Sequence, residues 1–244
     1  MGKLFVVGIG PGDKGNMTQL CQDCLRDCDI IVGYSGYTKR IRPLFPDKIY
    51  HETGMTLETE RCRTAIALAG EGKTVCVISS GDSGVYGMAS LVFELAEDLV
   101  RHVEIEVISG VTAAVSGAAL LGAPLGHDFA VISLSDMLTP WKTIENRLRA
   151  AAIGDFVICL YNPGSKKRTG HLCDACDVIL ETIPKDRLCG IARNIGREGQ
   201  SVSIMTLVEL REVQADMQET VFIGNSQTRS VGGRIVTPRG YRNE

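Results

Sequence analysis

Two glycine-rich turns, each directly after a run of apolar residues, constrain the fold of this chain more than any other feature. The first turn has the sequence Gly8-Ile9-Gly10-Pro11-Gly12, and the second, at 79–87, reads Ser-Ser-Gly-Asp-Ser-Gly-Val-Tyr-Gly. Glycine has no Cβ, so the backbone of such a turn can approach a ligand closely. Two such turns at strand ends predict a small ligand held at the carboxyl edge of a parallel sheet.

Apolar runs alternate with amphipathic stretches along the first half of the chain. Strands are predicted at 3–8, 29–33, 75–80 and 103–108, and helices at 17–28, 57–70, 85–99 and 112–121. Near-continuous apolar strands separated by helices are typical of a mostly parallel sheet covered on both faces. The first half is therefore predicted to be an α/β domain.

The pattern breaks at 122–128, where Gly and Pro cluster, so we place a boundary near residue 120, between domains 1–120 and 121–244. The second half predicts strands at 129–134, 155–161, 188–193, 201–206 and 220–224, and helices near 140–152, 167–183 and 206–213. Its last strands follow one another without long helices, which predicts a second α/β domain with a mixed, partly antiparallel sheet. Residues 232–244 are polar and contain glycine, and are expected to form a loosely held tail.

Composition excludes several classes of partner. The chain has 244 residues, 44% of them hydrophobic, and a net charge of −3, so nucleic-acid binding is not favoured. No apolar stretch is long enough to span a membrane, and the first residues lead into a strand without the layout of a signal peptide. We expect a cytoplasmic protein with no membrane partner.

Nine cysteines raise the question of a metal or redox site. The pairs Cys21/Cys24 and Cys173/Cys176 have Cys-x-x-Cys spacing, which zinc and iron–sulfur proteins use. Cys21, Cys24 and Cys28, however, lie at the spacing of the inward face of a helix, and the remaining cysteines fall in apolar stretches. Core packing is the favoured interpretation, with no metal expected, and metal analysis would decide the alternative.

The first glycine turn does not match the dinucleotide-binding fingerprint. Pro11 interrupts it, and the following helical pattern begins only after about Asn16. The second predicted strand ends in Gly33-Tyr34 where a dinucleotide-binding domain would have an acidic residue. A dinucleotide-dependent oxidoreductase is therefore the less favoured alternative.

Asp82, in the second glycine turn, has two interpretations. Its carboxylate could accept hydrogen bonds from a ribose diol or pair with a ligand ammonium. It could equally cap a helix beginning at Ser83. The residues do not separate these roles, and both can hold at once.

Two cationic turns occupy the second half. The first follows a predicted strand with Lys166, Lys167 and Arg168, and the second has the sequence Arg193-Asn194-Ile195-Gly196-Arg197. Three cations at a helix start oppose the helix dipole, which hints at carboxylate binding, although a solvated helix start is the ordinary explanation. No P-loop and no nucleophile elbow is present.

Taken together, these segments resemble the tetrapyrrole (corrin/porphyrin) methyltransferases, which use S-adenosylmethionine. The resemblance covers essentially the whole chain and rests on Gly8-Ile9-Gly10-Pro11-Gly12, Ser80-Gly81-Asp82, Gly110-Val111-Thr112-Ala113 and Leu160-Tyr161-Asn162. It implies the tetrapyrrole methylase fold, two α/β domains with the active site in the cleft between them. Ser83 stands where the family commonly has proline, which predicts a less rigid turn.

Within the family, the chain resembles the branch that methylates C17 of corrin precursors and contracts the ring, on residues 32–37, 79–89, 161–168 and 192–197. Methylation at C11 or C20 is the alternative, and whether the substrate contains cobalt stays open. The acceptor is an electron-rich ring carbon, so the protein need supply only alignment and exclusion of water. The resemblance also implies a homodimer.

The resemblance assigns residues to three roles. The S-adenosylmethionine site is expected to include Pro11, Ser80, Gly81, Asp82, Val85, Tyr86, Thr112, Ala113, Tyr161, Asn162, Gly190 and Ala192. The tetrapyrrole carries carboxylate arms, which guanidinium groups bind well. The residues expected to bind it are Gly10, Lys166, Arg168, Arg193, Asn194 and Arg197. The candidates for a catalytic role are Tyr34, Tyr37 and Asp82.

Overall fold

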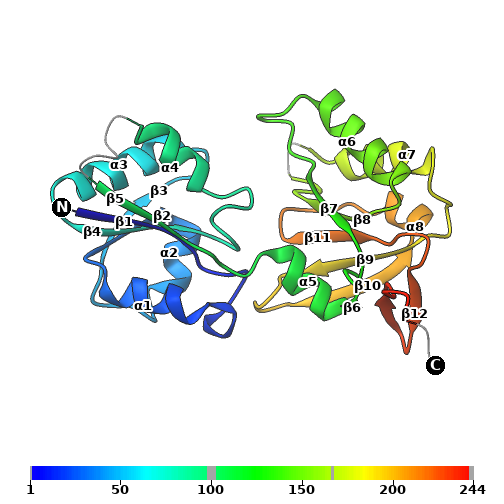
Figure 1. The fold of residues 1–244 in the computed structure, drawn as a ribbon, viewed down its shortest axis with the longest axis horizontal. Coiled ribbons are helices and arrows are strands. Elements are labelled where there is room, and N and C mark those ends of the chain that lie inside the picture. The colour runs from blue at the N-terminus through cyan, green and yellow to red at the C-terminus, as the bar shows by residue number, and fades with distance from the viewer. Residues whose placement is uncertain (1, 98–102, 166–167, 242–244) are drawn as a thin grey trace. The chain divides into compact units, whose positions relative to one another are not determined.

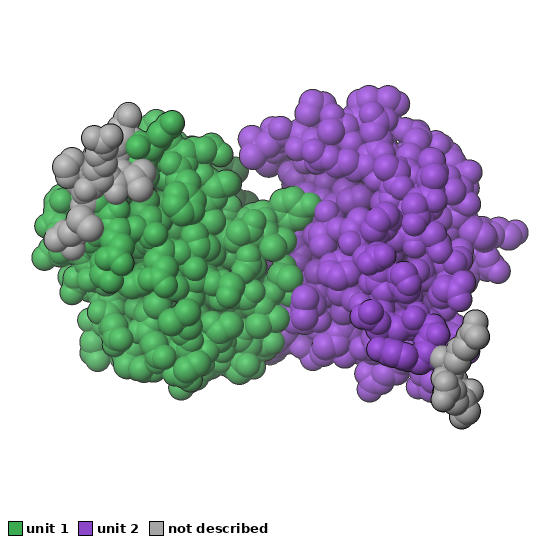
Figure 2. Space-filling model, in the orientation of Figure 1, with its two compact units in different colours: residues 1–112 green, residues 113–244 purple. Residues whose placement is uncertain are grey.

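The computed structural model describes residues 2–97, 103–165 and 168–241, and the chain divides into two compact units, 1–112 and 113–244 (Figure 2). The boundary predicted near residue 120 falls inside helix α5 (Ala113–Leu121). The structure places the division before this helix, because Ala114, Ala118 and Leu121 are buried in an apolar cluster of unit 2.

Unit 1 is built on a five-stranded parallel sheet (Figure 1). Its strand order is β3-β2-β4-β1-β5, and every pairing is parallel. The strands are β1 (Gly2–Gly8), β2 (Ile30–Tyr34), β3 (Ile49–Thr53), β4 (Thr74–Ser79) and β5 (Val103–Ile108). The parallel sheet predicted for the first half is therefore confirmed, and the carboxyl ends of all five strands share one edge.

Helices cover both faces of this sheet (Figure 1). One apolar cluster joins the sheet to α3 (Glu58–Gly70) and α4 (Ala89–Leu95), and another joins it to α1 (Gln19–Asp27) and α2 (Ser35–Ile41). The short 3-10 helix η1 (Lys14–Asn16) precedes α1. Thr18 caps α1 by accepting a hydrogen bond from the Cys21 amide, which satisfies one of the free amides of the first turn.

Three features of unit 1 differ from the sequence prediction. Helix α2 and strand β3 were not predicted. β3 is an edge strand with mostly exposed side chains, so it lacks the apolar run that marks a buried strand. Helix α4 begins at Ala89 rather than at 85, because residues 82–88 form a loop in which the Gly84 and Val85 amides donate to the Asp82 carboxylate.

Unit 2 contains a five-stranded mixed sheet of order β10-β9-β11-β8-β7, as predicted. Only the β7–β8 pairing is parallel among the described strands of this sheet, and the other three are antiparallel. The strands are β7 (Phe129–Ser133), β8 (Val157–Tyr161), β9 (Leu188–Arg193), β10 (Ser201–Thr206) and β11 (Glu219–Ile223). One face packs on α6 (Trp141–Ile153), α7 (His171–Leu180) and α8 (Leu207–Arg211), and the other packs on α5.

The prediction of a loosely held tail at 232–244 is wrong for the residues of β13. Strands β12 (Arg229–Val231) and β13 (Arg234–Val236) form a hairpin, and β13 pairs with the short strand β6 (Gly122–Ala123). Ile235 anchors this hairpin, because its side chain is buried against Leu121 in the cluster under α5. So short an apolar pattern gave no sequence signal.

Eight of the nine cysteines are buried, and Cys173 is half-buried. This confirms the core-packing interpretation. Desolvation by burial raises the pKa of Cys21 to about 12 and that of Cys62 to about 11, so both are neutral thiols. Within the described part of the chain, no three His, Cys, Asp or Glu side chains are grouped to hold a metal ion. No described helix combines the length and apolar character needed to cross a membrane.

Candidate functional site

The two glycine turns of unit 1 hydrogen-bond to each other. The Gly10 amide donates to the Gly81 carbonyl at 3.0 Å, and the Gly81 amide donates to the Gly10 carbonyl at 2.8 Å. Both residues have positive φ, 73° and 69°, which glycine adopts without steric cost. These two amides therefore serve the contact between the turns, whereas the sequence had suggested that they face a ligand.

A third turn, after β5, packs against the same two. A Cβ at Gly110 would lie 2.1 Å from the Gly81 carbonyl oxygen, and a Cβ at Gly8 would lie 2.7 Å from the Gly110 amide nitrogen. Both distances are far below van der Waals contact. The glycines thus let the turns that follow β1, β4 and β5 close-pack through their backbones.

Asp82 ties the second turn to the third. Its Oδ1 accepts from the amides of Gly84 at 2.8 Å and Val85 at 3.0 Å, and its Oδ2 accepts from the Gly110 amide at 2.8 Å. Asp82 therefore accepts from the backbone amides that follow it, as a helix cap does, but these amides belong to a loop and not to α4. A carboxylate has about four acceptor sites, so three internal bonds leave room for one donor from a ligand.

Ser83 holds the same turn from its other side. Its side chain is buried, and its hydroxyl donates to the Ile108 carbonyl at the end of β5 at 3.1 Å. This hydrogen bond ties the turn to the end of β5, and the expectation of a less rigid turn than with proline stays a prediction.

Backbone strain marks several of the expected site residues. Among the described residues, five other than glycine have positive φ, and three of them are Tyr86, Asn162 and Asn194. Such conformations are costly for bulky side chains and concentrate at ligand-binding sites. Tyr86 is also exposed, beside exposed Val85. No sequence pattern reports such strain, so this signal was available only from the structure.

Most residues expected to bind the donor or act in catalysis lie at one edge of unit 1. They follow the carboxyl ends of β1, β2, β4 and β5, which are neighbours in the sheet. The residues at this edge are Gly10, Pro11, Tyr34, Ser80, Gly81, Asp82, Val85, Tyr86 and Thr112. Tyr37 lies on α2, with its ring 5.1 Å from that of Tyr34 and nearly perpendicular to it.

In unit 2, the expected donor residues divide into two groups. Tyr161 and Asn162 end β8, where the Tyr161 hydroxyl oxygen accepts from the Ala114 amide at 2.6 Å and the Asn162 side chain donates to Ser133 Oγ at 2.9 Å. These contacts place the Tyr161 side chain at the start of α5, next to Ala113 in the chain, and the Asn162 side chain at the end of β7. This group is suited to a ligand site at a strand edge.

The second group, Gly190 and Ala192, lies inside unit 2 on β9. Ala192 is fully buried, and a Cβ at Gly190 would lie 2.7 Å from the Ile235 side chain and 2.8 Å from that of Leu121. Packing under α5 and β13 therefore explains both small residues. Neither offers a side chain to a ligand, and the assignment of both residues to the donor site stays a prediction.

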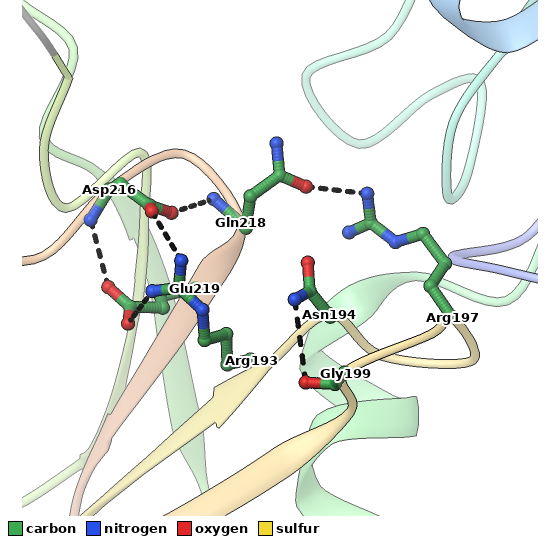
Figure 3. A network of polar contacts seen from close by, with 7 residues as sticks. All are labelled: Arg193, Asn194, Arg197, Gly199, Asp216, Gln218 and Glu219. Carbon is green, nitrogen blue, oxygen red and sulfur yellow. Dashed lines mark hydrogen bonds and ion pairs between the residues drawn. The ribbon is translucent and has the colours of Figure 1, made fainter.

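The second cationic turn is already occupied by groups of its own chain (Figure 3). Arg193 Nη1 donates to Glu219 at 2.7 Å and Nη2 donates to Asp216 at 2.8 Å. These two carboxylates, Glu219 first, raise the pKa of Arg193. Two of the five guanidinium N–H groups are thus used within the chain, and the assignment of Arg193 to the tetrapyrrole stays a prediction.

The remaining groups of this turn hold the turn itself (Figure 3). Arg197 Nη1 donates to Gln218 Oε1 at 2.6 Å, and the Asn194 side chain donates to the Gly199 carbonyl at 3.4 Å. The Asn194 amide donates to the Gln218 carbonyl. Both side chains therefore have internal partners, and they connect the β9–β10 turn to the segment before β11.

The first cationic turn differs. Lys166 lies outside the described residues, and the Arg168 side chain is 14% exposed. Arg168 Nη1 donates to Ser135 Oγ at 3.2 Å and lies 3.7 Å from Asp136 Oδ1. Sequence reasoning identified Arg168 but missed Ser135 and Asp136. Their position directly after a predicted strand is the same signal that singled out the glycine turns.

Comparison with known proteins identifies the family of this chain. A family model, Tetrapyrrole (Corrin/Porphyrin) Methylases, matches residues 3–211. The chain belongs to this family. Tetrapyrrole methylases use S-adenosylmethionine, so the protein is an S-adenosylmethionine-dependent methyltransferase. The resemblance seen in the sequence is confirmed, and the dinucleotide-dependent alternative loses its support.

Two named relatives within the tetrapyrrole methylases match over nearly their whole length. The chain is 45% identical to the probable cobalt-factor III C(17)-methyltransferase of Salmonella typhimurium, over 98% of this chain and 99% of that protein. It is 39% identical to the precorrin-3B C(17)-methyltransferase of a Sinorhizobium species, over 98% and 97%. The crystal structure of the methyltransferase CobJ matches with a TM-score of 0.90 and 40% identity, over 98% of this chain and 100% of that one. The predicted tetrapyrrole methylase fold is thus confirmed.

Proposed function

We propose that this tetrapyrrole methylase transfers a methyl group from S-adenosylmethionine to C17 of a corrin precursor, with ring contraction, in cobalamin biosynthesis. The observation that carries the proposal is near full-length identity of 39–45% to two proteins named as C17-methyltransferases. A methyl transfer to an electron-rich ring carbon needs alignment and exclusion of water, and no protein nucleophile.

We assign the donor to the strand-end turns that carry the expected residues. In unit 1 these are the close-packed glycine turns, with Asp82 offering its remaining acceptor site to a donor group of the ligand. Tyr161 and Asn162, at the end of β8 in unit 2, are kept as candidates for donor binding on the family resemblance alone. Tyr34 and Tyr37 stay candidates for a catalytic role, because they lie at or beside the same edge of unit 1.

The proposed acceptor is cobalt-factor III. Identity to the relative named for this cobalt-containing substrate is 45%, against 39% for the relative named for metal-free precorrin-3B. The nine reduced cysteines also suit an oxygen-poor cytoplasm. We further propose that the enzyme is a cytoplasmic homodimer, which sedimentation at several protein concentrations would test.

The proposal is tested with the methyl donor labelled. The protein is incubated with methyl-labelled S-adenosylmethionine and either cobalt-factor III or precorrin-3B, and the product is analysed by mass spectrometry and NMR. We expect one labelled methyl at C17, faster with the cobalt-containing acceptor. A methyl at C11 or C20 would overturn the positional assignment, and no transfer despite normal donor binding would overturn the activity.

A further inference from the structure

Unit 2 carries a polar cluster at the carboxyl ends of β7 and β8, the parallel pair of its sheet. Two loops meet there: residues 134–140 between β7 and α6, and the described residues 162–165 and 168–170 between β8 and α7. Ligands of α/β proteins bind where parallel strands end. The loops are joined by side-chain contacts among Ser133, Ser135, Asp136, Asn162, Arg168 and His171.

Asp136 lies at the centre of this cluster. Its Oδ1 is 3.7 Å from Arg168 Nη1, and its Oδ2 is 3.4 Å from His171 Nε2. The His171 ring also packs edge-on against Trp141, with ring centroids 4.8 Å apart. One carboxylate therefore sets the positions of a guanidinium and an imidazole that come from a different loop and a different helix.

The guanidinium groups of Arg168 and Arg193 differ in the partners they already have. Both outer nitrogens of Arg193 donate to carboxylates at 2.7 and 2.8 Å. Arg168 donates to a neutral hydroxyl, its carboxylate neighbour lies beyond hydrogen-bond distance, and its Nε has no partner among the described residues. A guanidinium with unused donors is suited to a ligand carboxylate.

Two exposed apolar side chains follow Asp136 directly. Met137 is 65% exposed and Leu138 is 98% exposed, so neither contributes to the core of unit 2. They follow directly on Asp136, which lies 3.7 Å from the Arg168 guanidinium, so one short segment carries two exposed apolar side chains and the carboxylate that faces the cation. A tetrapyrrole has the matching chemistry, an apolar ring system with carboxylate arms.

We propose that the cluster around Asp136 is a subsite for one carboxylate arm of the tetrapyrrole, with Met137 and Leu138 against the macrocycle. The inference rests on the proposed function for its choice of ligand. Arg168 and Ser135 bind the arm, and Asp136 is a positioning residue that holds Arg168 and His171. Burial of the Leu138 side chain by the macrocycle adds apolar contact area to this charged contact.

Leu138→Ser is the most informative variant. Because the side chain is 98% exposed, its removal leaves folding unaffected, so a change in substrate affinity reports contact with the ligand. The matched control is Ile153→Ser, a 73% exposed apolar residue at the other end of α6, roughly 18 Å from the start of that helix. Arg168→Gln removes the positive charge. Arg168→Lys keeps the charge but lacks the paired N–H donors of the guanidinium group.

Binding is measured without turnover. Trp141 is the single tryptophan of the chain and lies in the cluster, so quenching of its emission by a bound tetrapyrrole gives the affinity. The probes are cobalt-factor III and uroporphyrin, each as free acid and as methyl ester. Donor affinity is measured in parallel by calorimetry, and melting temperature reports folding.

We expect Leu138→Ser to weaken binding of the free acids about five- to tenfold, with donor affinity and melting temperature unchanged, and Ile153→Ser to bind normally. Arg168→Gln should weaken the free acids but not the esters, and Arg168→Lys should recover part of the loss. Normal tetrapyrrole binding by both Leu138→Ser and Arg168→Gln would overturn the subsite. If the wild-type protein binds tetrapyrrole but does not methylate cobalt-factor III, the proposed reaction fails while these variants still test the subsite.

Discussion

A methyl group added at Gly110 would meet the Gly81 carbonyl oxygen at 2.1 Å, so this position admits no side chain. We expect Gly110→Ala to destabilise the protein by about 3 kcal/mol, because two backbone turns would have to separate. Donor binding should weaken as well, since Asp82 accepts from the Gly110 amide. Chemical denaturation and calorimetric titration with S-adenosylmethionine measure the two effects.

Gly70 provides the matched control for Gly110→Ala. It is the last residue of α3, a Cβ added there would meet no packed neighbour within 4 Å, and its backbone does not need positive φ. Gly70→Ala should leave stability unchanged or raise it by up to about 1 kcal/mol, because alanine loses less entropy on folding. Equal destabilisation by the two substitutions would contradict the close-packing of the three turns.

Asp82→Asn tests whether this carboxylate acts through the turn or on the ligand alone. An amide keeps one acceptor oxygen where the carboxylate serves three backbone amides, so the loop 82–88 loses hydrogen bonds. We expect stability to fall by about 2 kcal/mol and donor affinity to fall about tenfold. If Asp82→Asn weakens donor binding without lowering the free energy of unfolding, Asp82 acts on the ligand and not through the turn.

At the scale of single residues, the sequence singled out positions whose contacts only the structure shows. Gly81 and Asp82 were identified, but the pairing of their turn with Gly10 appears only in three dimensions. Arg168 and Arg193 looked equivalent as cations after strands. Their difference comes from Asp216 and Glu219, which lie 23 and 26 positions from Arg193 and reach it only when β9 and β11 pair.

At the scale of elements, Arg193 connects β9 to β11 and to the segment before it (Figure 3). We expect Arg193→Gln to lower the melting temperature while leaving the KM for the tetrapyrrole nearly unchanged, because the guanidinium is engaged by two carboxylates of its own chain. Arg168→Gln should show the opposite pattern. Thermal unfolding and steady-state kinetics on both variants decide this, and a large rise in KM for Arg193→Gln would return Arg193 to the substrate site.

The helices and strands that the sequence predicted correctly are those with long apolar runs or a clear periodic spacing of apolar residues. The parallel strands and long helices of unit 1 follow near-continuous apolar runs, which tertiary structure cannot easily override. β3, β12 and β13 lie at sheet edges or in a small hairpin, where few apolar residues are needed. The late start of α4 follows from the hydrogen bonds of Asp82, because side-chain acceptors compete with helix formation.

At the scale of the whole molecule, cysteine burial predicts a simple labelling pattern. We expect iodoacetamide to modify Cys173 in the native protein and all nine cysteines after unfolding. The reactive form is the thiolate, and burial raises the pKa of Cys176 to about 12. A hydrogen bond with Cys76 lowers the pKa of Cys28, but Cys28 is buried, so exclusion of the reagent should dominate.

Mass spectrometry of peptides from the native and unfolded protein measures this pattern directly. Cys62, a buried thiol of α3, is the internal control, because it is both inaccessible and protonated. Rapid labelling of Cys28 in the native state would contradict the burial argument. It would indicate that the end of α1 opens on the timescale of the reaction.

The boundary between the two units yields the last prediction. A fragment of residues 113–244 keeps α5, whereas a fragment of residues 121–244 lacks it. Without α5, the face of the sheet that carries Cys159, Ala192 and Phe222 loses its cover, which exposes a core cluster. We therefore expect the longer fragment to unfold cooperatively on heating and the shorter one to aggregate or to lack a transition. Circular dichroism melts of both fragments measure this, and equal cooperativity would place the boundary near residue 120, where the sequence pattern breaks.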